Sequence, residues 1–229
     1  MEQFYQLSMI GYIGFTAIIV ITLVTYYFKH KKRSKEMESL SYTIGCTYTE
    51  KNDEIPSLLA NTKLLREGNM RGALNVLEKT ARNYKVILWD DHYSVMLGRH
   101  SKQFRQTIIC YLSQKDLGLP RFTIQSKTFF LKNMDYTRHK KINFDTNPEF
   151  SKRFYLKGKD KAAIRSIFNT DILSAFETIQ DKKMCIESTW KMLVFFKPNK
   201  LIQVQDIPME LEKTEKIYNM FAKANISTP

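Results

Sequence analysis

A long uncharged run near the N-terminus constrains this chain most. No charged side chain occurs between Gln3 and Phe28, and the twenty residues from Met9 to Phe28 are mostly apolar. As a helix rising 1.5 Å per residue, twenty residues span about 30 Å, the thickness of a bilayer's hydrocarbon core. Aromatic residues, which favour membrane interfaces, stand at both ends of the run: Phe4, Tyr5, Tyr26 and Tyr27. The sequence therefore predicts a transmembrane anchor within residues 1–35.

Two other interpretations of this run explain the sequence less well. A cleaved signal peptide needs a basic residue before a shorter apolar stretch, whereas only Glu2 precedes this one, and no small-residue cleavage site follows it. A helix buried in a soluble core does not explain why twenty uncharged residues end at a basic cluster.

The basic cluster sets the expected orientation. Five basic residues follow the run and none precedes it: Lys29, Lys31, Lys32, Arg33 and Lys35. Under the positive-inside rule, the N-terminus lies outside a bacterial inner membrane and the rest of the chain lies in the cytoplasm. The unpaired cysteines Cys46, Cys110 and Cys185 agree with a reducing compartment. The cluster acts as a stop-transfer signal or as a lipid-surface contact that orients the domain against anionic headgroups.

The rest of the chain is predicted to be α+β, with a largely antiparallel sheet of hairpins and packed helices. We expect a polar connector at 36–41 and a cytoplasmic domain at 42–225, with two lobes that can meet near 126–145. Alternating β-branched and aromatic residues predict a long hairpin from Tyr84–Leu97 and Arg99–Gln114. No βαβ alternation appears, which disfavours a doubly wound nucleotide-binding sheet.

Shorter patterns predict the other elements. Strands are expected at 41–49, at 122–124 and before Gly158, with a hairpin at 184–199; helices are expected at 57–65, 160–168, 170–180 and 207–225. The segment 73–83 has a helical composition but alternating apolar residues, so helix and strand both stay open. Asn147-Pro148 indicates a turn, and Phe150, Phe154 and Leu156 are expected to point inward.

The order of several segments resembles a known group. KVILWDDHYSV precedes LPRFTI, then FDTNPEFSKRFYLKGKDKAAIRSIF, then ILSAFETI and a hairpin that ends in MLVFFKP. This order, over roughly 70–225, is similar to that of uncharacterised bacterial membrane-anchored proteins with a C-terminal α+β domain of unknown function. The resemblance implies a fold and a location but no reaction and no catalytic residues.

Motifs for catalysis are absent from the sequence. It contains no phosphate-binding glycine loop, no HExxH, no CxxC and no GxSxG. The one notable cluster is Asp90-Asp91-His92, in which alternate strand residues place Asp90 and His92 on one face. A divalent metal held there, with His100 or His139 nearby, would make the protein a metal-dependent enzyme. The simpler interpretation is a solvated acidic strand end, so we predict no catalytic residue, no bound metal and no cofactor.

The net charge points to an anionic partner. The whole chain carries +13, from 36 basic and 23 acidic residues. The candidate partner-binding residues are Arg99, Lys102 and Arg105 on the hairpin and Arg138, Lys140 and Lys141 on a later loop. We therefore predict a non-enzymatic interaction or scaffold module at the membrane surface, with an unknown protein partner. A tethered domain that binds anionic lipid or nucleic acid is the other alternative, and nucleic acid is the less favoured ligand because the domain is tethered.

Overall fold

The structure, a computed structural model, describes residues 2–62, 69–115, 117–127, 141–179 and 183–226. Eight strands form one sheet in the order β1-β2-β3-β4-β8-β7-β5-β6, and every described pair of neighbouring strands is antiparallel. Strands from both sides of residues 126–145 belong to this sheet. The predicted α+β class with a largely antiparallel sheet is confirmed.

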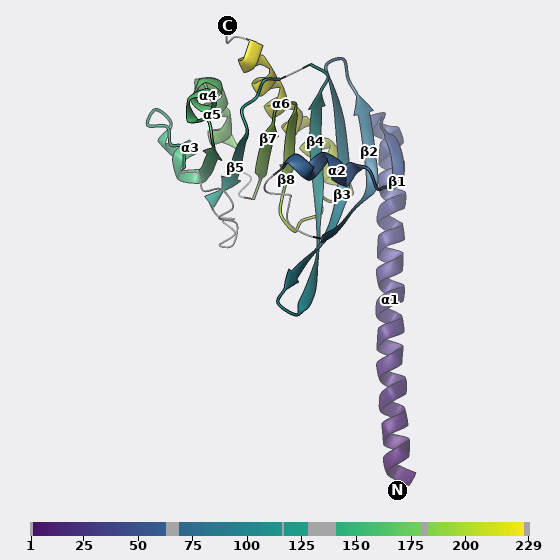
Figure 1. Cartoon of the computed structure of the whole chain (residues 1–229). Helices are drawn as coiled ribbons and strands as arrows, with labels where there is room; N and C mark the ends of the chain where they lie inside the picture. Colours follow the sequence, from purple (N-terminus) through teal and green to yellow (C-terminus); the bar gives the residue numbers. More distant parts are fainter. Residues whose placement is uncertain (1, 63–68, 116, 128–140, 180–182, 227–229) are drawn as a thin grey trace.

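A single long helix, α1 (Glu2–Ile44), stands beside the β1 end of the sheet and projects far beyond it (Figure 1). Residues 36–41, for which the sequence predicts a connector, are instead helical. The apolar residues Met37, Leu40 and Ile44 follow each other at helical spacing and face the domain, so the helix continues until Gly45 ends it with a φ of +66°. Among the described side chains, which in α1 begin at Gly14, no helix has a stretch long and apolar enough to span a membrane.

The first four strands form a meander next to α1. They are β1 (Thr47–Asn52), β2 (Asn69–Thr80), β3 (Tyr84–Leu97) and β4 (His100–Ser113). The predicted β3–β4 hairpin is confirmed, and its pairing runs unbroken from Tyr84 opposite Ser113 to Leu97 opposite His100. Its end extends past the sheet, alongside α1 and toward the N-terminus of that helix (Figure 1). The ambiguous segment 73–83 is mostly strand, and the strand expected from residue 41 begins only at Thr47 because α1 takes the residues before it.

The second half of the chain completes the sheet and covers one of its faces. The strands are β5 (Phe122–Ser126), β6 (Phe154–Gly158), β7 (Cys185–Thr189) and β8 (Met192–Phe196). The helices are α3 (Pro148–Arg153), α4 (Lys161–Ile167), α5 (Thr170–Thr178) and α6 (Ile207–Ile226). The expected turn at Asn147-Pro148 starts α3, because a proline suits the first turn of a helix. Phe150, Phe154 and Leu156 are buried, as predicted.

The two faces of the sheet carry separate cores. On one face, Val86 and Leu88 join a large cluster with α6 and with the aromatic side chains of α3–α5. On the other face, Ile87 and Trp89 join a smaller cluster under α2 (Ile55–Leu58) and the 3-10 turn η1 (Leu59–Asn61). Because strand residues alternate between faces, Asp90 lies on the α1 and α6 face and Asp91 on the α2 face.

Candidate functional site

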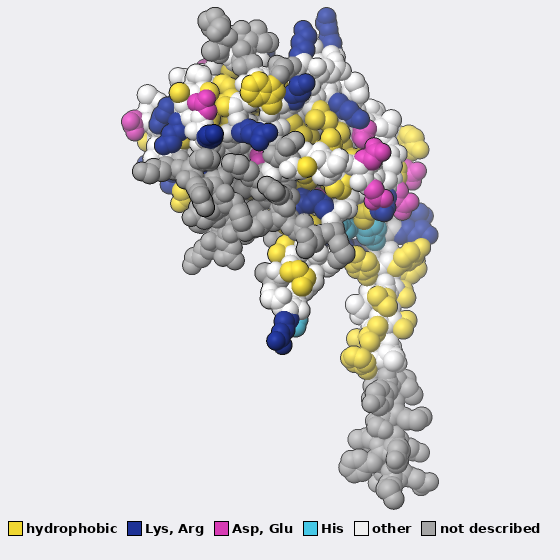
Figure 2. Space-filling view, in the orientation of Figure 1, with side chains coloured by type: hydrophobic (Ala, Val, Ile, Leu, Met, Phe, Trp, Pro, Cys, Tyr) yellow, Lys and Arg dark blue, Asp and Glu magenta, His cyan; other side chains and the backbone are white. Residues whose placement is uncertain are grey.

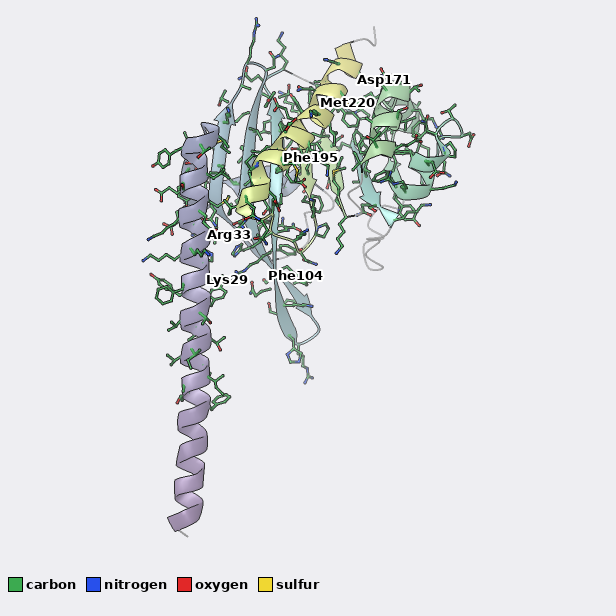
Figure 3. All side chains as sticks on the ribbon, turned by 180° about the vertical axis from the view of Figure 1, so that it is seen from behind. Lys29, Arg33, Phe104, Asp171, Phe195 and Met220 are labelled. Atoms are coloured by element: carbon green, nitrogen blue, oxygen red, sulfur yellow. The ribbon has the colours of Figure 1, made fainter. Side chains whose placement is uncertain are left out.

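A buried carboxylate joins α1 to the sheet. Asp90 is 1% exposed on β3 and accepts two hydrogen bonds from the guanidinium of Arg33 on α1. The Nε–Oδ2 distance is 2.6 Å and the Nη2–Oδ1 distance is 2.8 Å. A third guanidinium nitrogen, Nη1, donates to the carbonyl of Ile202 at 2.9 Å. This two-point geometry fixes orientation as well as charge, so α1, β3 and the segment before α6 are held in one arrangement (Figure 3).

Neighbouring strands complete the environment of this carboxylate. Asn75 lies at an irregularity in the β2–β3 pairing with a φ of +51°, and its Nδ2 donates to Oδ2 of Asp90 at 2.9 Å. Thr107, opposite Asp90 on β4, donates to Oδ1 at 3.0 Å and accepts from the backbone N–H of Ile202 at 3.0 Å. Asp90 therefore accepts four hydrogen bonds from side chains of three elements.

Arg33, Asn75 and Asp90 of this network line a wide groove between α1 and the β3–β4 hairpin. The groove has a volume of about 1150 Å³, and its other wall is the segment from Asn199 to Gln205. The charged side chains that line it are five basic and two acidic: Lys29, Lys32, Arg33, Arg105, Lys200, Glu36 and Asp90. The net charge of this lining is +3, and Phe104 and Tyr26 add aromatic surface. Figure 3 shows Lys29 and Arg33 on α1 and Phe104 on the hairpin across from them. We call this feature the helix–hairpin groove.

Two contacts that involve aromatic rings connect the hairpin with α1 on the N-terminal side of Arg33. The rings of His30 and His92 meet edge to face at 5.9 Å, and the guanidinium of Arg105 lies 4.7 Å from the ring centre of Tyr26. Burial lowers the pKa of His92, with further lowering from His30 and Arg33 that the Asp90 carboxylate opposes. His92 is therefore a neutral donor or acceptor in the groove at neutral pH.

The hairpin residues predicted for partner binding occupy different environments. Arg99 and Lys102 are exposed near the tip, while Arg105 is half-buried against Tyr26 and lines the groove. Figure 2 shows basic side chains at this tip. The hairpin therefore divides into an exposed tip and a base that belongs to the groove.

The second group of predicted partner-binding residues, at 138–141, does not share a surface with this hairpin in the described part of the chain. Lys141 contacts the ring of Tyr155 on β6 at 5.4 Å, and burial together with Lys127 lowers its pKa to about 8. Three strands separate β6 from β4 in the sheet, so at about 4.8 Å per strand these two strands lie some 19 Å apart. Arg138 and Lys140 lie outside the described residues.

The five basic residues expected at a lipid surface also separate. Lys29, Lys31, Lys32 and Lys35 are exposed, whereas the Arg33 side chain is only 16% exposed and is committed to Asp90. Arg33 is thus not available as a lipid contact. Lys32 lies 3.7 Å from Glu36 in a surface ion pair, which contributes little to stability.

The Asp90-Asp91-His92 sequence is divided between the two sheet faces. Asp91 pairs with Arg71 of β2, at 3.0 Å between Oδ2 and Nη1, and accepts from Gln106 at 3.1 Å. Burial raises the pKa of Asp91 to about 6, against the opposing effects of Arg71 and Gln106. Among the described residues, no group of three His, Cys, Asp or Glu side chains is placed to hold a metal ion.

The sequence does not reveal the main residues of this site. Arg33 and Asp90 are 57 positions apart, and Asn75 reaches Asp90 only because the β2 backbone is irregular there. One signal was readable: the helical spacing of Met37, Leu40 and Ile44 indicates that α1 continues into the domain with a buried face. That continuation is what brings Arg33 against the sheet.

One solved structure is similar to this fold. It is the crystal structure of the mycobacterial trehalose monomycolate transport factor A, TtfA, with a TM-score of 0.60 and 12% sequence identity. The similarity covers 83% of this chain and 93% of that one. At this identity the similarity concerns the fold alone. No protein-family model matches the chain, and no curated protein matches it either.

Proposed function

We propose that this chain is a single-pass, membrane-anchored interaction module that holds an anionic partner at the membrane surface without catalysis of its own. Its N-terminus is outside and its α+β domain in the cytoplasm. The observation that carries the proposal is the continuity of α1 with the domain. One helix contains the uncharged run, the basic cluster and the wall of the helix–hairpin groove.

Rigid coupling supports this role. A flexible connector would let the domain tumble beneath its anchor, whereas the Arg33–Asp90 pair holds the sheet at a fixed angle to the helix. The groove would then always lie at the same distance from the bilayer. A fixed binding surface close to the membrane suits a protein that positions partners.

The chemistry of the groove indicates the charge of the partner. Its lining carries a net +3, and Lys29 and Lys200 are exposed within it. An acidic protein segment matches this charge. The similar structure is called a transport factor, and by analogy of fold alone this chain would serve in transport.

A photo-crosslinking experiment in cells tests the groove. A benzoylphenylalanine replaces Phe104 in the full chain, and in a control it replaces the exposed Met209 on α6. We expect a discrete heavier adduct with the groove probe that weakens when Lys200→Glu is added. Equal adducts from both positions, or none from the groove, would overturn the proposal.

Reporter fusions after Pro229 test the anchor independently. Green fluorescent protein fluoresces only when the domain is cytoplasmic, and alkaline phosphatase is active only when it is outside. We expect fluorescence without phosphatase activity, and a pellet that resists carbonate extraction. Phosphatase activity without fluorescence would contradict the proposed orientation.

A further inference from the structure

We propose that the tip of the β3–β4 hairpin, residues 95–102, is a second membrane contact that lies in the anionic headgroup layer beside α1. The inference rests on the anchorage proposed above and adds a lipid partner for a surface outside the helix–hairpin groove. It follows from the position of the tip along α1, from the length of the uncharged run and from the composition of the tip.

The contacts between α1 and the hairpin fix the position of the tip along the helix. Arg33 meets Asp90, His30 meets His92, and Tyr26 meets Arg105, which pairs with His92. Moving toward the N-terminus of α1 therefore means moving toward the tip of the hairpin. The pairing continues for five more residues on each strand, to Leu97 opposite His100. At about 3.3 Å per residue the tip extends at most roughly 17 Å further, alongside the uncharged run.

The uncharged run is longer than a bilayer core requires. Gln3 to Phe28 is 26 residues, or about 39 Å of helix, while the hydrocarbon core is about 30 Å thick. Roughly 9 Å of this helix can therefore lie in the headgroup layer. If residues near the N-terminus fill the hydrocarbon core, Leu23 to Phe28 lie among the headgroups, where exposed tyrosines such as Tyr26 and Tyr27 are favoured. The two strands that lead from the His92–Arg105 pair toward the tip extend along this part of α1, because Arg105 lies against Tyr26 and the hairpin continues toward the N-terminus of the helix.

The composition of the tip matches that layer. No acidic residue occurs from Tyr93 to Arg105. Arg99, His100 and Lys102 are exposed, and Met96 is 58% exposed beside them. Figure 2 shows apolar and basic side chains together at this end of the hairpin. Basic side chains are attracted to an anionic surface, and an exposed methionine adds apolar area that the interface can bury.

The experiment measures the contact of Met96 with lipid in the full chain. The chain is reconstituted in nanodiscs of phosphatidylcholine with phosphatidylglycerol, and Met96→Cys is labelled with an environment-sensitive fluorophore. Cys46→Ser removes the half-buried native thiol, while Cys110 and Cys185 are buried. Lipids with a nitroxide near the headgroup serve as quenchers. We expect strong quenching, at least half of that seen at an interfacial helix position such as Leu23→Cys.

Two control positions separate the inference from the proposed function. Ile18→Cys, on the exposed surface of α1, reports the anchor itself, and Glu212→Cys, on the exposed surface of α6, reports solvent. Quenching at residues 18 and 96 but not at 212 supports the inference. Quenching at 18 but not at 96 overturns the inference and leaves the anchor intact. No quenching at 18 removes the anchor, and the inference with it.

A charge change identifies the lipid chemistry. Arg99→Glu combined with Lys102→Glu should remove most of the quenching at residue 96, and so should replacing phosphatidylglycerol by phosphatidylcholine. Lys115→Glu with Lys191→Glu makes the same change in net charge at exposed positions away from the tip and should leave the quenching unchanged. Equal quenching with and without anionic lipid would overturn the proposed headgroup recognition.

Discussion

The two ends of the sheet are held by different interactions. At the α1 end, the buried carboxylate of Asp90 joins helix and sheet by accepting four hydrogen bonds, two of them from the guanidinium of Arg33. At the β6 end, five phenylalanines pack together, and the Phe150 ring lies 5.4–6.0 Å from four others. The hydrophobic effect is non-directional, whereas two-point hydrogen bonding specifies one geometry. We infer that the α1 end is built to set an orientation and the β6 end to supply stability.

The largest effect is expected at the aromatic end. Phe150 is fully buried among Phe144, Phe154, Phe168 and Phe176. Phe150→Ala should lower the free energy of unfolding by about 3–5 kcal/mol, because it removes buried apolar area and leaves a cavity. Denaturant unfolding of the full chain in detergent measures this loss. As a control, Met209→Ala, at a 62% exposed position, should change the free energy of unfolding by no more than about 0.5 kcal/mol. A loss below about 1 kcal/mol in Phe150→Ala would contradict the stabilising role given to the β6 end.

A smaller loss of stability with a larger change in geometry is expected at the α1 end. Asp90→Asn removes the charge that Arg33 faces, and we expect a loss of about 2–3 kcal/mol, because Arg33 keeps some access to solvent. Amide hydrogen exchange should accelerate in residues 29–44 of α1 and not in α5. Arg33→Met added to Asp90→Asn should recover part of the stability and none of the orientation. Unchanged exchange in α1 would show that apolar contacts alone position the helix.

The sequence predicts helices, strands and their buried apolar faces better than it predicts polar contacts between these elements. The β3–β4 hairpin, the α4 and α5 helices and the burial of Phe150 and Phe154 follow from local periodicity and caps. The Arg33–Asp90 pair does not, because periodicity shows which face a residue occupies but not which distant residue it meets. The expected connector at 36–41 is instead part of a helix: Glu36, Glu38 and Ser39 are exposed, while Met37 and Ser41 are buried.

The buried carboxylate of Asp91 is expected to make the stability of the fold depend on pH. Burial raises the pKa of Asp91 to about 6, above the value near 3.9 of an unfolded chain. Between these values the folded protein binds the extra proton, so the stability of the natural chain relative to Asp91→Asn should rise as the pH falls from 7 to 4. The rise should be on the order of 2 kcal/mol.

The opposite sign is expected at a surface carboxylate. Lys152 lowers the pKa of Glu149, so stability relative to Glu149→Gln should fall as the pH falls through the acid range. Chemical unfolding across pH 4–7 checks both signs. A flat difference for Asp91→Asn would mean that Arg71 fully compensates the buried charge.

The smallest expected effect tests whether the β6 end has its own polar specification. The Oδ1 atom of Asn169 accepts from the backbone N–H of Ile172 at 3.0 Å and caps α5, the helix that carries Phe176 into the aromatic cluster. Asn169→Ala should cost about 1 kcal/mol, and Asn169→Asp should retain most of the cap. If apolar packing positions α5, amide hydrogen exchange in α5 should stay slow in Asn169→Ala until the whole protein unfolds, even though the variant is less stable. Early exchange confined to α5 would instead mean that both ends of the sheet depend on single polar contacts for their geometry, and the contrast between them would be one of degree.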